Sequence, residues 1–95
     1  MSAPEILDRA TKAKAVLDSP AFAGAFESVR NALIKGLEDC PSEDVKNAED
    51  FRKCLKLLKA VRLNLETAIN TGKLEQFQMN ELEKRRTNPL RGIFR

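Results

Sequence analysis

The chain has 95 residues, 42% of them hydrophobic and 33% charged, which is enough for one small domain but too short for two independent cores. It carries 17 Lys and Arg against 14 Asp and Glu, a net charge of +3, and shows no run of 18 apolar residues and no secretory signal pattern. This composition excludes a membrane span, and we expect an intracellular protein without a membrane partner.

Two helices are expected in the first part of the chain, over residues 4–18 and 20–38. Ser2 begins a capping box before the first helix, and apolar residues then recur at helical spacing. Ser19 is a good N-cap for the second helix, and Pro20 suits its first position. The second helix is expected to bury one apolar face, formed by Phe22, Phe26, Val29, Leu33 and Leu37.

The longest helix is expected over residues 43–70, after a short connection containing Pro41 that sets it antiparallel to its predecessor. Ser42 is expected to cap this helix. Gly72 has the position of a left-handed C-cap, so the pattern predicts a helix end there and a fourth helix over 73–86. The apolar stripe of the long helix consists of Phe51, Cys54, Leu55, Leu58, Val61, Leu65 and Ile69.

The expected fold class is all-α, because no segment alternates apolar and polar residues and β-branched residues are few. Residues 1–86 should form a single helical domain, a small bundle built on a long antiparallel helical hairpin. Residues 87–95 should form an extended basic C-terminal tail. Apolar side chains on helix faces are usually buried, so four phenylalanines are expected in the core: Phe22, Phe26, Phe51 and Phe77.

Catalytic and metal-binding roles have little support in the sequence. Histidine, the commonest general base and metal ligand, is absent, and there is no glycine-rich phosphate loop. The acidic stretch from Glu38 to Asp50 lacks the spacing of a calcium loop. Cys40 and Cys54 would lie roughly 16 Å apart, too far for a disulfide, so both are expected to be reduced, with Cys54 in the core. We therefore expect a non-enzymatic protein with no cofactor and no metal.

Positive charge is concentrated at the C-terminus. Residues 1–83 carry 12 basic against 14 acidic side chains, whereas residues 84–95 carry five basic and no acidic ones. Such a segment can contact an acidic protein surface or phosphates, or only keep a frayed end soluble. A basic group on the long helix can likewise be a partner surface or a solvated face. The predicted partner-binding residues are Lys84, Arg85, Arg86, Leu90, Arg91, Ile93, Phe94 and Arg95 at the C-terminus, and Arg52, Lys56, Lys59 and Leu63 on the long helix.

Two stretches, DSPAFAGAFESVRNALIKGLEDCPSED and LETAINTGKLEQFQ, resemble small helical proteins that tailed bacteriophages and prophages encode near their head and packaging genes. The shared elements are the Asp-Ser-Pro helix start, the Ala25-Phe26 pair, the short Pro-containing turn and the TGKL sequence, within about residues 10–83. They are structural signals, so no site residues are transferred. The resemblance implies a protein of virion assembly or genome packaging, located in the host-cell cytoplasm, with the virion as a second location.

The resulting hypothesis is a structural or adaptor protein. Leu90, Ile93 and Phe94 would insert into a pocket on a protein partner or a sister subunit, and the basic residues would orient the contact. A bundle of this size gains stability by self-association, so a homo-oligomer is one expected form. The alternative is a packaging accessory that contacts DNA phosphates, and a small regulator or inhibitor of a host protein is a third option.

Overall fold

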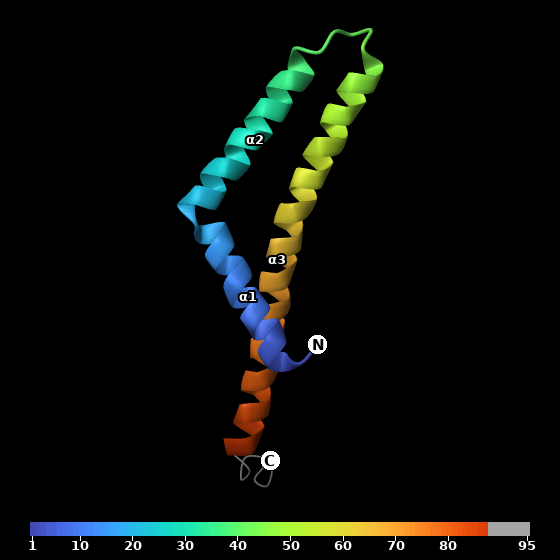
Figure 1. Ribbon diagram of the computed structural model, residues 1–95. Coiled ribbons are helices and arrows are strands. Elements are labelled where there is room, and N and C mark those ends of the chain that lie inside the picture. Colours follow the sequence, from blue (N-terminus) through green and yellow to red (C-terminus); the bar gives the residue numbers. More distant parts are fainter. Residues whose placement is uncertain (88–95) are drawn as a thin grey trace.

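The computed structural model describes residues 1–87, and the all-α prediction is confirmed for this range. The three helices are α1 (Ala3–Asp18), α2 (Pro20–Glu38) and α3 (Val45–Thr87). α1 and α2 follow one another along α3 and run in the opposite direction to it (Figure 1). The radius of gyration is 21.5 Å, against roughly 12 Å for a compact domain of this length. The chain therefore forms a long, narrow molecule of 74 × 25 × 22 Å.

The Ser-Pro pair at residues 19 and 20 separates α1 from α2. Ser19 takes an extended conformation (φ −70°, ψ 122°), which the following proline favours. Ser19 also begins α2, since its Oγ accepts a hydrogen bond from the backbone N–H of Phe22 at 3.4 Å. Both helices lie within one residue of their predicted spans. α1 lies directly against the C-terminal half of α3, whereas α2 runs more loosely beside its N-terminal half (Figure 1).

A short turn over residues 39–44 joins α2 to α3, and its last residue caps α3. The Oδ1 atom of Asp44 accepts a hydrogen bond from the backbone N–H of Asn47 at 3.3 Å. Ser42, the predicted cap, instead donates its hydroxyl hydrogen to Glu43 at 3.3 Å. The cap prediction was therefore wrong by two residues. A carboxylate at this position also complements the positive end of the helix dipole.

α3 continues through Gly72, so the predicted helix end there and the separate helix over 73–86 are wrong. Gly72 is buried and does not have the positive φ of a left-handed cap. Its missing side chain serves packing, because a Cβ atom there would collide with the Cβ of Ala10 in α1. Glycine thus permits a close approach of two helix backbones. Beyond this contact α3 extends past the start of α1 (Figure 1).

Few side chains in the described part of the chain are enclosed. Ala13, 5% exposed, is the one buried apolar side chain among them. Phe77 is 62% exposed and Cys54 is exposed, so both core predictions were wrong. Both cysteines are free. At each level α3 has one main helix beside it, so no position is surrounded on all sides. The other three phenylalanines predicted for the core are half-buried: Phe22, Phe26 and Phe51.

No helix within residues 1–87 combines the length and the apolar character needed to cross a membrane.

Candidate protein-interaction site

A groove with a volume of about 920 Å³ runs between α2 and α3. Its floor is apolar, because residues that recur every three or four positions on the two helices face one another there. The rings of Phe22 and Phe26 lie 5.9 Å apart at an angle of 38°. We call this surface the α2–α3 groove. Its half-buried floor residues are Phe22, Phe26, Ile34, Leu55 and Leu58.

Charged side chains form the rim of the α2–α3 groove. Arg62 donates from Nε to Oε1 of Glu66 at 3.2 Å, and its guanidinium carbon lies 5.7 Å from the ring centre of Phe26. That distance is within cation–π range. Arg30 on α2 and Lys59 on α3 also line the groove. Within residues 1–87 neither has a carboxylate at ion-pair distance. The rim therefore offers two unpaired cations on opposite sides.

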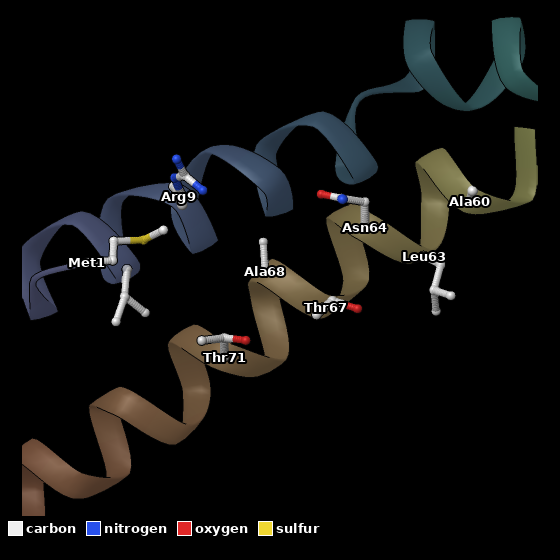
Figure 2. A pocket seen from close by; sticks show the side chains of 9 residues that line it. Met1, Arg9, Ala60, Leu63, Asn64, Thr67, Ala68 and Thr71 are labelled. Atoms are coloured by element: carbon white, nitrogen blue, oxygen red, sulfur yellow. The ribbon is translucent and has the colours of Figure 1, made fainter. Parts of the chain in front are cut away.

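A smaller groove of about 380 Å³ lies beside the contact between α1 and α3. Figure 2 shows Asn64 and Ala68 on the side of α3 that faces α1, and Leu63 pointing away from α1. Met1, two residues before α1 begins, and Arg9 of α1 lie above α3 in the same view (Figure 2). This groove has less than half the volume of the α2–α3 groove, and the side chains from α3 that line it are mostly small, such as Ala60, Thr67 and Ala68.

Several large apolar side chains of α3 are exposed on the side opposite Gly72, the residue that packs against α1. Leu63 and Leu74 are each 58% exposed, and Phe77 is 62% exposed. Leu74 is rotated about 200° from Gly72, which faces α1, at ~100° per residue. We call this surface the outer stripe. It consists of Ala60, Leu63, Thr67, Asn70, Leu74 and Phe77, all exposed.

The four predicted binding residues on the long helix are all exposed, and their intervals of four, three and four place them along one face of α3. Lys59 and Leu63 line the α2–α3 groove, whereas Arg52 and Lys56 lie outside its lining. Sequence reasoning missed Arg30, which the folding of α2 against α3 brings opposite Lys59. The spacing of Arg30 four residues after Phe26 was the available signal, since these positions share a helix face.

The predicted C-terminal binding residues divide between two parts of the chain. The basic last turn of α3 holds three of them, and Lys84 donates to Glu81 at 3.5 Å. These three, Lys84, Arg85 and Arg86, are exposed. The remaining five, Leu90, Arg91, Ile93, Phe94 and Arg95, lie outside the described residues.

The described residues contain no group of three His, Cys, Asp or Glu side chains close enough to hold a metal ion together. Lys14 of α1 lies outside the lining of both grooves. Lys14 donates a hydrogen bond to Asp18 at 2.7 Å, and this bond together with the carboxylate charge raises the pKa of Lys14 above its ordinary value of 10.5. The chemistry offered by residues 1–87 is therefore apolar contact and charge pairing.

The whole sequence and the fold of the chain were compared with those of known proteins. No protein-family model, no curated protein and no solved structure matches the chain.

Proposed function

We propose that this chain is a non-enzymatic adaptor that binds an acidic amphipathic helix of a protein partner in the α2–α3 groove. One observation carries the proposal: two antiparallel helices present a continuous apolar floor that no third helix of residues 1–87 covers. Amphipathic helices commonly bind such grooves through apolar residues spaced by three and four.

The apolar floor supports a helix as the occupant. The five floor residues are half-buried and leave area open to solvent. Burial of apolar area contributes about 25 cal/mol per Å². A third helix laid along the groove would also complete the small bundle, on the antiparallel α2 and α3 pair, that the sequence predicts. Packing of three helices encloses a seam that two helices leave exposed.

The rim supports an acidic occupant. Arg30 and Lys59 are unpaired cations on the two sides of the groove, while Arg62 is already paired with Glu66. Glu27 is an unpaired carboxylate on the same rim, so the excess of unpaired charge is positive by one. Acidic side chains flanking the apolar face of the bound helix would pair with Arg30 and Lys59 and set its orientation.

The C-terminal segment is proposed as a second contact with the same partner. Leu90, Ile93 and Phe94 supply apolar side chains, and the basic last turn of α3 precedes them. The resemblance to small phage proteins would give this adaptor a role in virion assembly or genome packaging, where protein subunits must be joined in order.

Site-specific crosslinking in the producing cells tests the proposal. A photoreactive residue in place of Lys59 should capture a protein other than this chain, identified by mass spectrometry. The same residue in place of Lys35, a lysine of α2 that is exposed but does not line the groove, is the matched control. Arg30→Glu in the Lys59 variant should abolish the product, and a chain ending at Arg86 should reduce its yield. Two results would contradict the groove as the binding site. One is equal capture from positions 59 and 35, and the other is an unchanged yield of crosslinked product when Arg30→Glu is added.

A second candidate function is contact with nucleic-acid phosphates through the end of α3. The observation behind it is the exposed basic run Lys84, Arg85 and Arg86, in which Lys84 alone has a nearby carboxylate within residues 1–87. Phosphate contacts weaken steeply as counterions compete, so affinity for DNA should fall at least tenfold between about 50 and 200 mM salt. Mobility-shift measurements at the two salt concentrations check this, and absence of a shift at low salt excludes the role.

A further inference from the structure

The outer stripe of α3 has the spacing of one half of a coiled coil. Its six residues follow at intervals of three, four, three, four and three, a heptad series that reads the same in both directions. We infer that a second copy of this chain binds the outer stripe, with the two α3 helices antiparallel. The outer stripe borders both grooves: Leu63 and the flanking Glu66 also line the α2–α3 groove, and Ala60, Leu63 and Thr67 line the smaller groove. The inference rests on the stripe and does not depend on the proposed function.

The antiparallel arrangement pairs side chains of matching size and polarity. When the two stripes are aligned about their midpoint, Leu63 of one copy lies at the level of Leu74 of the other. Thr67 then meets Asn70, which places the two polar members of the stripe together, where a hydroxyl and an amide can exchange a hydrogen bond. At the ends the small Ala60 meets the large Phe77. A single polar layer in an apolar seam is a known means of fixing helix register.

Charges beside the stripe agree with the same register. The layer beyond Ala60 and Phe77 pairs Lys56 of one copy with Glu81 of the other, and symmetry makes this contact twice. Along one flank, Glu66 of one copy lies beside Lys73 of the other, again twice. One layer further out, the same register places Lys53 of one copy beside Lys84 of the other. This like-charged pair lies at the solvated end of the contact, and Glu81 is close to Lys84. Within one copy Glu66 pairs with Arg62 at 3.2 Å and Glu81 with Lys84 at 3.5 Å, so the four opposite-charge contacts would extend these pairs across the dimer, against one weak repulsion at each end.

The stripe is free to make this contact. Its six side chains are exposed, and the close contacts of α3 with the other helices lie at other positions, at Gly72 against Ala10 of α1 and at Phe51 against Gly36 of α2. From Lys56 to Glu81 the overlap covers about 38 Å of each helix at ~1.5 Å per residue. The outer stripe itself, from Ala60 to Phe77, covers about two and a half heptads, and the charged Lys56–Glu81 layers extend the contact at both ends. α3 extends past the start of α1 (Figure 1), and Phe77 in the overlap is 62% exposed.

Sedimentation equilibrium of the full chain tests the pairing. The wild type should be a dimer at micromolar concentration, and Leu74→Glu with Phe77→Glu should raise the dissociation constant at least ~100-fold, since four apolar side chains are lost from the seam. Both side chains are exposed, at 58% and 62%, so the circular dichroism of the variant should stay helical. Val45→Glu is the control, because Val45 is equally exposed at 66% but lies outside the overlap. A monomeric wild type, or a dimer equally weakened by Val45→Glu, overturns the inference.

Charge exchange tests the antiparallel register. Lys56→Glu alone and Glu81→Lys alone should each raise the dissociation constant about tenfold, because each turns two attractions into repulsions. The double variant restores opposite charges and should regain the wild-type value. In a parallel dimer Lys56 would face Lys56, so the single changes would not weaken the dimer. That result would show that the inferred antiparallel register is wrong. Capture of a partner at Lys59 can fail or succeed whatever these outcomes are, so failure of one proposal is distinguishable from failure of the other.

Discussion

The contact of α1 with α3 differs from that of α2 with α3 in the size of the side chains between them. Ala10, Ala13 and Gly72 form the first contact, and their small size allows the backbones to approach until Ala13 is buried. Phe22, Phe26 and Leu58 form the second, and there the helices stand apart and leave a groove. Small residues thus produce a closed interface with little apolar area, whereas large residues produce an open one with more area to offer.

The largest expected effect comes from adding one methyl group to the closed interface. Gly72→Ala places a Cβ against Ala10 and should lower the free energy of unfolding by about 1–3 kcal/mol, although alanine is the better helix former. Gly24→Ala is the matched control, because nothing lies within 4 Å of its added Cβ, and it should stabilise α2 by up to about 1 kcal/mol. Urea denaturation at one protein concentration measures both. If Gly72→Ala proves as stable as Gly24→Ala, the close contact of α1 with α3 is refuted.

A larger side chain should act in opposite directions at the two interfaces. Ala13→Leu overfills the contact of α1 with α3 and should cost about 1–2 kcal/mol of unfolding free energy. Ala23→Leu adds apolar area beside the α2–α3 groove, where there is room, and should gain up to about 1 kcal/mol. Thermal unfolding followed by circular dichroism compares the two variants. Equal destabilisation by both would mean that α2 packs as tightly as α1.

A smaller effect is expected from the side chain that spans the α2–α3 groove. Arg62→Gln removes the cation from the Phe26 ring and from Glu66, and should cost about 0.5–1 kcal/mol, since the site is partly exposed. Arg52→Gln is the control, because Arg52 is exposed without an ion pair in the described part of the chain, and it should change stability by less than about 0.5 kcal/mol. Denaturation of the two variants in parallel gives the difference. An equal result would show that Arg62 does not hold α2 against α3.

The smallest effect concerns the exposed ion pair within α1, which touches neither interface. The pKa of Lys14 is raised by Asp18, so the pair stabilises α1 fully below pH 10.5, and this contribution is lost as pH rises through the raised value. Titration of the Lys14 side chain by NMR should give a pKa above 10.5, and Asp18→Asn should bring it back to the ordinary value. An unchanged pKa in the variant would remove the pair as the cause.

The sequence predicts best the elements whose residues favour a single backbone conformation. Proline after serine leaves a chain no helical alternative at residue 19, so the boundary between α1 and α2 was predictable. Gly72 was not, because a missing side chain suits a left-handed cap and a close helix contact equally well. Periodicity placed Phe77 on an apolar helix face, but whether another helix covers that face depends on the side of α3 against which α1 packs, and the contact of Ala10 with Gly72 decides that side. The α2–α3 groove depends on the angle between two helices, which local pattern does not contain.

The continuity of α3 through Gly72 has a consequence for anything that binds its two ends. A helix of 43 residues is about 64 Å long at ~1.5 Å per residue. A break at Gly72 would have allowed the last 15 residues of α3 to change direction relative to the rest of the helix. The distance between the turn over residues 39–44 and the basic last turn of α3 would then have varied. Because α3 is one continuous helix, the distance between its two ends is fixed. Two molecules bound at its opposite ends are held at a set spacing, and a rotation imposed at one end is transmitted to the other.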